Sequence, residues 1–93
     1  MTDTTKNWCV YIIQCSDNSL YTGISKDVDR RFNQHVNLQG AKYFRGRQPD
    51  ALVYVENGHD RRTASQREFA IKKLTRPKKL QLIAAAINKP IEL

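Results

Sequence analysis

WCVYIIQCSDNSLYTGIS, residues 8–25, decides the fold of this 93-residue chain. Its two ends, WCVYIIQC and LYTGIS, are rich in β-branched and aromatic residues, which is typical of strands, and the polar residues 16–19 between them favour a turn. The stretch therefore predicts an antiparallel hairpin with strands at 8–15 and 20–25. Each strand carries one tyrosine, Tyr11 and Tyr21, and the turn decides how the two are oriented.

The length of this turn decides whether the tyrosines share one face of the sheet. Because side chains alternate with period two, an even loop sets Tyr21 opposite Gln14 and places the tyrosines on opposite faces. An odd loop formed by residues 16–18 sets Tyr21 opposite Ile13 and places both on one face. Shared chemistry requires the same face, so we predict an odd loop or a bulge.

The rest of the chain predicts four more helices and strands. They are, in order, a helix at 26–40, a strand at 50–58, and helices at 63–74 and 76–89, with a glycine- and proline-bounded loop at 40–49 before the strand. Gly40 is expected to end the first helix, an Asn57-Gly58 turn to end the strand, and the capping box Thr63-x-x-Gln66 to begin the next helix. The order β-β-α-β-α-α predicts an α+β domain with a small three-stranded, mostly antiparallel sheet flanked by helices.

Length and composition predict one domain that is not inserted in a membrane. No segment is apolar enough to cross a bilayer, and the polar start of the chain lacks the apolar stretch of a signal peptide. We expect a cytoplasmic protein with a flexible N-terminus (1–7), a domain at 8–88 and a C-terminal tail (89–93). Cys9 and Cys15 lie six apart in one strand, too far for a disulfide, and are expected to be buried.

Charge is the most informative bulk property. The net charge is +7 and the isoelectric point about 9.7, which predicts a polyanionic partner, most simply nucleic acid. Between residues 61 and 79 the chain has eight lysines and arginines and a single acid, Glu68. The residues expected to contact DNA are Lys26, Lys42, Arg45, Arg47, Arg62, Lys72, Lys73 and Lys78. A basic surface without a specific partner explains the same charge, and this alternative stays open.

The candidates for chemistry are dispersed, because no phosphate-binding glycine loop, HExxH or nucleophile elbow is present. Arg31 and His35 lie one turn apart on the apolar side of the first predicted helix. They are also explained as a snorkelling arginine and a hydrogen-bonded, half-buried histidine. Glu68 can form an ion pair with Lys72 four residues on, or hold Mg²⁺ together with water and substrate phosphate. The other histidine, His59, is expected to be exposed.

The ordered set of VYI at 10–12, YTG at 21–23, Arg31, His35 and Glu68 resembles the GIY-YIG nuclease superfamily. The resemblance covers nearly the whole chain and is closest to the small stand-alone bacterial members and the Slx-type nuclease domain. It implies a metal-dependent endonuclease that hydrolyses DNA phosphodiester bonds, is selective for DNA structure, and is linked to repair or recombination. The implied cofactor is Mg²⁺ or Mn²⁺.

The resemblance also assigns roles to individual positions. The matching residues are the motif tyrosines Tyr11 and Tyr21, the glycine Gly23, the catalytic arginine Arg31, the histidine His35 and the metal-binding glutamate Glu68. Tyr11 is expected to deprotonate or orient the attacking water and Tyr21 to hydrogen-bond the phosphate, in the same pocket as Arg31 and Glu68. A phenol is a weak base at neutral pH, so the metal or Arg31 is expected to lower its pKa.

Two other functions stay open. One is a non-catalytic nucleic-acid-binding module on the same fold, and the other is a protein-interaction adaptor. Target choice is expected to come from the basic surface, from a homodimer or from an accessory protein, because the chain has no second DNA-binding module. The intact set of tyrosines, arginine and glutamate favours the nuclease.

Overall fold

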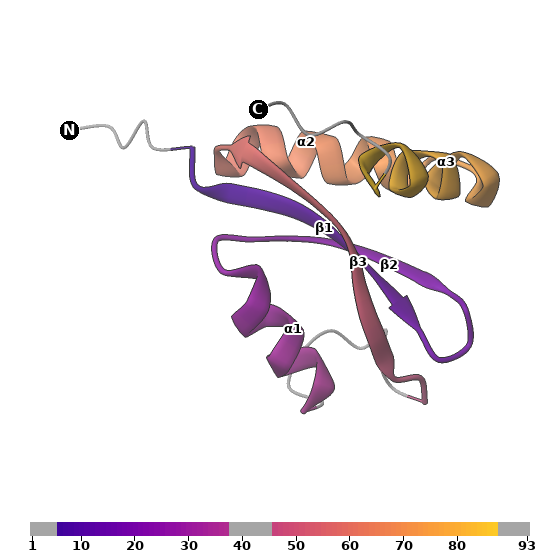
Figure 1. The fold of residues 1–93 in the computed structure, drawn as a ribbon. Helices are drawn as coiled ribbons and strands as arrows, with labels where there is room; N and C mark the ends of the chain where they lie inside the picture. The colour runs from indigo at the N-terminus through magenta and orange to yellow at the C-terminus, as the bar shows by residue number, and fades with distance from the viewer. Residues whose placement is uncertain (1–5, 38–45, 88–93) are drawn as a thin grey trace.

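The computed structural model describes residues 6–37 and 46–87. They form strands β1 (Trp8–Cys15), β2 (Leu20–Ser25) and β3 (Pro49–His59) and helices α1 (Val28–Val36), α2 (Arg61–Lys72) and α3 (Arg76–Ile87). The order β-β-α-β-α-α confirms the predicted fold class (Figure 1). Gly40, Lys42 and Arg45 lie outside the described residues, as do most of both predicted tails. No helix in the described parts of the chain is long and apolar enough to cross a membrane.

The hairpin has the predicted odd loop. Ile13 pairs with Tyr21, and the N–H of Cys15 donates to the carbonyl of Ser19 at 2.9 Å, which leaves residues 16–18 as a three-residue loop. Asn18 has a φ of 68°, the left-handed conformation that such loops require and that asparagine tolerates. Both tyrosines therefore lie on the same face of the sheet.

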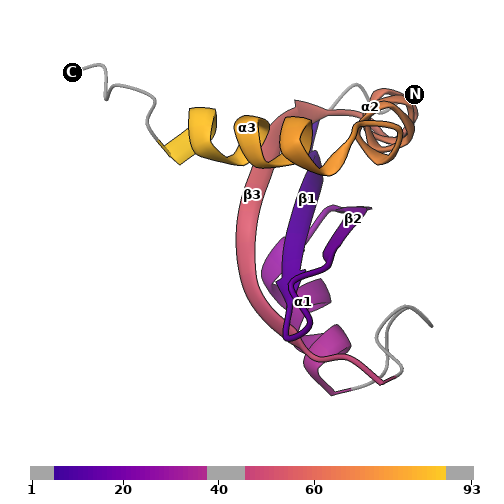
Figure 2. The ribbon, with the colours of Figure 1, turned by 90° about the vertical axis from the view of Figure 1, so that its right-hand side faces the viewer.

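β1 is the central strand, and β3 bends strongly along its pairing with β1. The sheet is antiparallel with the order β2-β1-β3, and the pairing of β1 with β3 shifts register at three places. Each shift inserts an extra residue into β3, and such bulges bend a strand and increase its twist. Figure 2 shows the resulting curvature of β3. The predicted Asn57-Gly58 turn is wrong: Gly58, with a φ of 85°, lies inside β3 at one of these shifts, where its conformational freedom serves the bulge.

Two predicted helix boundaries are also wrong, and local hydrogen bonds explain both. α2 begins two residues early, because Asp60 is the N-cap: its carboxylate accepts the N–H of Thr63 at 2.8 Å, and the Thr63 hydroxyl accepts the N–H of Asp60 at 3.1 Å. Thr63 therefore takes the third helical position, not the cap position. α1 ends at Val36, well before Gly40, because Asn37 caps it and donates its N–H to the carbonyl of Asn33.

The two faces of the sheet carry separate cores. α2 and α3 cover one face and α1 covers the other (Figure 1). The first core contains Val10, Ile12, Tyr54, Ala64, Ile71 and Ile83, and the second contains Tyr11, Ile13 and Cys15 with Tyr21, Val28, Phe32 and Leu52 packed against them. Both cysteines are free, and Cys15 is buried as expected. Cys9 is only half-buried, contrary to expectation, and its thiol donates to Asn57 Oδ1 at 3.1 Å.

A partly buried polar network joins the end of β3 to α2. His59 is half-buried rather than exposed, because its Nε2 lies 2.7 Å from Glu56 Oε1 and its Nδ1 3.0 Å from the Thr63 hydroxyl. Glu56 also accepts hydrogen bonds from the Tyr54 hydroxyl and from Arg67 Nε at 3.0 Å. The sequence shows these residues only as scattered polar positions, and the bulged strand brings them together.

Glu56 should make this domain sensitive to acid. Burial alone raises its pKa, but hydrogen bonds from Tyr54 and His59 and the charge of Arg67 outweigh burial and hold the pKa below its ordinary value of 4.5. A carboxyl with a lowered folded-state pKa stabilises the fold above its unfolded-state pKa, and this contribution is lost as pH falls through the folded-state value. We expect Glu56→Gln to lower the free energy of unfolding at neutral pH by about 1–3 kcal/mol. As the pH falls below 4.5, the free energy of unfolding should decrease less in the variant than in the wild type.

Denaturant unfolding at neutral and acid pH measures both effects. Asp50→Asn removes an exposed carboxyl from the same strand and serves as the matched control, with little change expected at either pH. Equal pH dependence of wild type and Glu56→Gln would contradict the assigned role.

Candidate active site

Three rings form the centre of the candidate site. The Tyr11 ring centre lies 6.2 Å from that of Tyr21, and the Tyr21 ring centre lies 5.3 Å from that of His35. The Tyr11 hydroxyl and His35 Nε2 are hydrogen-bonded at 3.0 Å. Tyr11 and His35 are buried, whereas Tyr21 is half-buried and so reaches the solvent side of the cluster. The two tyrosines and the histidine therefore lie together, and His35 is hydrogen-bonded but fully buried, not half-buried as expected.

Gly23 makes room for this arrangement. It pairs directly with Tyr11 across the sheet, and a Cβ built at Gly23 would lie 2.5 Å from the Tyr11 hydroxyl oxygen and 2.6 Å from Cζ. Any side chain at this position would overlap the Tyr11 ring. The motif glycine therefore lets Tyr11 lie across β2 with its hydroxyl at His35.

The site keeps both phenols protonated and the histidine neutral. Burial, the charge of Tyr21 and the charge of Glu68 raise the pKa of Tyr11. Arg31 lowers this pKa, but by less than the other effects raise it. Burial and Glu68 likewise raise the pKa of Tyr21, against opposing effects of Arg31 and a hydrogen bond with Tyr11. Arg31 thus acts on both phenols in the expected direction, but burial outweighs it. Burial and the charge of Arg31 lower the pKa of His35, so its imidazole is neutral at neutral pH.

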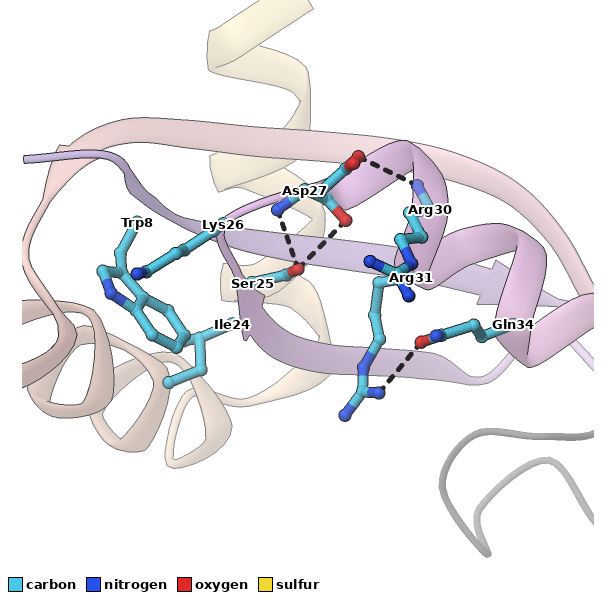
Figure 3. Close-up of a pocket in the computed structure, with 8 residues that line it drawn as sticks. All are labelled: Trp8, Ile24, Ser25, Lys26, Asp27, Arg30, Arg31 and Gln34. Carbon is cyan, nitrogen blue, oxygen red and sulfur yellow. Dashed lines mark hydrogen bonds between the residues drawn. The ribbon is translucent and has the colours of Figure 1, made fainter.

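Arg31 lies on α1 at the rim of the cluster. Its side chain is exposed, and Nη1 donates to Gln34 Oε1 at 3.1 Å (Figure 3). Its charge nevertheless lowers the pKa values of Tyr11, Tyr21 and His35. An exposed cation at the edge of a buried phenol cluster is placed to meet an incoming phosphate.

Glu68 comes from the opposite face of the sheet, so it does not share one face with the tyrosines and Arg31 as the predicted common pocket implied. It lies on α2, and its charge raises the pKa values of both Tyr11 and Tyr21. Because β2 is an edge strand with α1 on one face and α2 on the other, the candidate site lies along its outer edge. The alternative role of Glu68 is also present: Lys72 Nζ lies 3.4 Å from Oε2. Lys72 is exposed and Glu68 half-buried, and ion pairs near the surface contribute only about 0–1 kcal/mol, so a divalent cation can compete with Lys72.

The donor set fits a hard cation and little else. In the parts of the chain that the structure describes, no three histidine, cysteine or acidic side chains gather as they would in a zinc site. Glu68 offers one carboxylate with 24% of its side-chain surface exposed. Mg²⁺ is commonly held by one or two carboxylates, with water and substrate phosphate completing the octahedron. The residues present therefore fit Mg²⁺ bound jointly by Glu68 and a substrate.

The predicted DNA contacts divide between several places. Lys26 precedes α1 and lines the same pocket as Arg31 (Figure 3). The exposed residues Arg62 and Lys72 lie on α2, Lys73 directly after it, and Lys78 on α3. Arg47 instead forms an ion pair with Asp17 of the hairpin loop at 3.3 Å.

Sequence reasoning missed Trp8. Its ring centre lies 5.7 Å from Lys26 Nζ and 5.8 Å from Arg61 Cζ, beside the arginines of α1. The one signal in the sequence was that this is the single tryptophan of the chain.

Comparison with known proteins finds several similar bacterial proteins. A UPF0213 protein of Clostridium perfringens is 53% identical over 76 residues, which cover 82% of each chain. A UPF0213 protein of Desulfotalea psychrophila is 48% identical over 80 residues, covering 85% of this chain and 73% of the relative. Among solved structures, the UPF0213 protein of Bacillus halodurans is 44% identical with a TM-score of 0.53, covering 83% of this chain and 82% of that one.

A second solution structure extends the likeness over the full chain. A protein from E. faecalis is 30% identical with a TM-score of 0.62, and the match covers 100% of this chain and 98% of the other. The family model described as the GIY-YIG catalytic domain matches residues 7–81, which include both tyrosines, Gly23, Arg31, His35 and Glu68. The chain belongs to the GIY-YIG family of nuclease domains.

Proposed function

We propose that this protein is a DNA endonuclease that hydrolyses phosphodiester bonds with Mg²⁺ or Mn²⁺ bound at Glu68. We further propose that it is selective for DNA structure and serves repair or recombination. One observation carries the hydrolase: Tyr21 lies beside the buried, hydrogen-bonded pair Tyr11–His35, and the charges of Arg31 and Glu68, from helices on opposite faces of the sheet, both act on these phenols. A module that only binds DNA has no need for this convergence.

Burial suggests a division of labour between the tyrosines that reverses the expected one. Tyr21 is half-buried, so its hydroxyl can contact the attacking water, whereas Tyr11 is buried behind it and hydrogen-bonded to His35. In the proposed step, a proton of the water passes to the Tyr21 oxygen as Tyr21 gives its own to Tyr11. Tyr11 in turn gives its proton to Nε2 of the neutral His35. In this relay no phenol has to keep the extra proton, which a phenol would do poorly because it is a weak base. The proton ends on the imidazole of His35, which is a stronger base.

The remaining groups act on the phosphate. The water oxygen bonds to phosphorus as the bond to the leaving oxygen breaks, and the leaving oxygen keeps the electron pair and takes up a proton from solvent. Arg31 offsets the charge that builds on the non-bridging oxygens. A divalent cation held by Glu68 would supply Lewis-acid polarisation of the phosphate. The exposed basic residues of α2 and α3 would hold the flanking strand by contacts with its phosphates.

A panel of DNA structures tests the proposal. Nicked, branched, single-stranded and duplex DNA are incubated with the wild-type protein, with Mg²⁺, with Mn²⁺ and with a chelator. We expect metal-dependent cleavage of at least one non-duplex structure. Failure to cut any of them with either metal would refute the nuclease. Salt-sensitive binding that persists in Arg31→Ala and Glu68→Ala without cleavage would instead establish the binding module. Gel filtration with and without DNA tests whether a homodimer takes part.

A further inference from the structure

A pocket beside the candidate active site has no role in the proposed hydrolysis. It lies between the start of β1, the end of β2 and α1, and Trp8, Ile24, Lys26, Arg30 and Arg31 are among the residues that line it (Figure 3). Its volume is about 320 Å³. That is the lower end of the range of roughly 300–1,000 Å³ in which small-molecule pockets fall. Because Arg31 borders both this pocket and the phenol cluster, the pocket adjoins the place of proposed cleavage.

Trp8 gives the pocket an aromatic surface. Part of the indole packs against the core under α2 and α3, and the half-buried remainder lines the pocket. Two cations lie by the ring, with Lys26 Nζ 5.7 Å and Arg61 Cζ 5.8 Å from its centre. Packing alone explains a tryptophan in a core, but it does not explain why a pocket opens beside the ring with cations around it.

The charge of the pocket is positive. Lys26, Arg30 and Arg31 are all exposed there, and the one carboxylate among the lining residues, Asp27, is engaged as the N-cap of α1 by the N–H of Arg30. Aromatic rings next to cations are the usual means by which proteins bind single-stranded nucleic acid, with bases on the rings and phosphates on the cations. In a duplex both faces of a base are covered by its neighbours, so only an unpaired base is free to stack on a side chain.

We propose that this pocket binds an unpaired nucleotide next to the scissile phosphate, with its base stacked on Trp8 and its phosphate held by Lys26 and Arg30. The position relative to the cut rests on the proposed nuclease function, whereas the binding itself does not. The pocket would make the enzyme select DNA with a single-stranded segment adjoining the site of cleavage.

The fluorescence of Trp8 tests this directly, because it is the only tryptophan in the chain. The full chain, with a chelator to prevent cleavage, is titrated with single-stranded oligothymidylate, a duplex of the same length, and thymidine monophosphate. We expect saturable quenching by the single strand and much weaker quenching by the duplex at equal occupancy. Equal quenching by the duplex would overturn the proposal. Equal quenching by the monophosphate at the same concentration would overturn the assignment to a strand and indicate a free-nucleotide site.

A second measurement separates stacking from charge. By anisotropy of labelled strands, Trp8→Leu should weaken binding of the single strand at least about fivefold, whereas Trp8→Phe should retain most of the affinity. The wild type should bind an abasic strand of the same length more weakly than the normal strand. Trp8→Leu should bind the two strands equally well, because the stacking contact is already lost. Lys26→Gln keeps the ring, and should weaken binding of both strands and reduce the salt dependence.

Phe69→Leu provides the matched control, because Phe69 is an exposed ring with Lys73 Nζ 4.2 Å from its centre but is not among the residues lining this pocket. A loss in Phe69→Leu equal to that in Trp8→Leu would overturn the pocket. If Trp8→Leu fails to fold, Trp8→Phe, Lys26→Gln and the wild-type quenching still decide. Cleavage without Trp8 quenching would refute this inference alone, and quenching without cleavage would refute the nuclease alone.

Discussion

Glu68→Gln is expected to lower the rate of DNA cleavage at least about a thousandfold, because the neutral amide cannot hold the divalent cation that the proposed reaction needs. The substitution is nearly isosteric, and it removes only the exposed ion pair with Lys72, so the free energy of unfolding should change by less than about 1 kcal/mol. Single-turnover cleavage across a range of Mg²⁺ concentrations measures the effect.

Two further measurements test whether a loss of cleavage in Glu68→Gln comes from unfolding or from weaker DNA binding. Thermal unfolding and DNA binding in the presence of a chelator should both be close to wild type, since neither needs the cation. Glu68→Asp keeps a carboxylate but shortens the side chain, so it should retain part of the activity and require more metal. Cleavage by Glu68→Gln at the wild-type rate would show that Glu68 is only the ion-pair partner of Lys72.

Gly23→Ala is expected to damage both stability and activity. Its Cβ would lie 2.5 Å from the hydroxyl oxygen of Tyr11, a buried side chain that has little room to move away. Overpacking of this kind costs about 1–3 kcal/mol. The displaced phenol would also lose its hydrogen bond to His35, and we expect cleavage to fall at least about a hundredfold, the lower range for loss of a proton-transfer group. Denaturant unfolding and single-turnover cleavage measure the two losses.

A double variant and a substitution at a second glycine test whether the loss in Gly23→Ala comes from overlap with the Tyr11 ring. Tyr11→Leu removes the overlapping ring, so Gly23→Ala should cost less stability in that background than in the wild type. Gly58→Ala is the matched control: no atom lies within 4 Å of its Cβ, but its φ of 85° makes alanine unfavourable. It should lose about 1 kcal/mol through the backbone and keep its activity. Additive costs of Gly23→Ala and Tyr11→Leu would contradict a direct overlap.

The site was predictable to the extent that its residues follow the periodicity of single elements. Strand alternation and the three-residue loop bring Tyr11 and Tyr21 to one face, and helical spacing places Arg31 near His35. The position of Glu68 was predicted by family resemblance alone, because it depends on how α2 packs against the edge strand. The proposed exchange of roles between the tyrosines could not be predicted, because it rests on which of the two is buried.

Other errors have a common origin in competing local signals. Asp60 and Thr63 both offer N-caps for α2, and Gly58 suits a turn as well as a bulge, so the sequence leaves each choice open. The structure selects the options in which β3 extends to His59 and joins Glu56 to Arg67.

The sequence by itself determined the order of the elements and the antiparallel hairpin, because these depend on alternation, turn chemistry and spacing between near neighbours. The turn residues allow an even or an odd loop, so the shared face of the two tyrosines was predicted from the chemistry expected of them and was decided by the observed register. Only the tertiary structure decided the curvature of β3, the polar network at its end, the approach of Glu68 around β2 and the pocket beside Trp8. Each of these joins residues from different elements, and their distances follow from packing across the sheet, which no local pattern encodes.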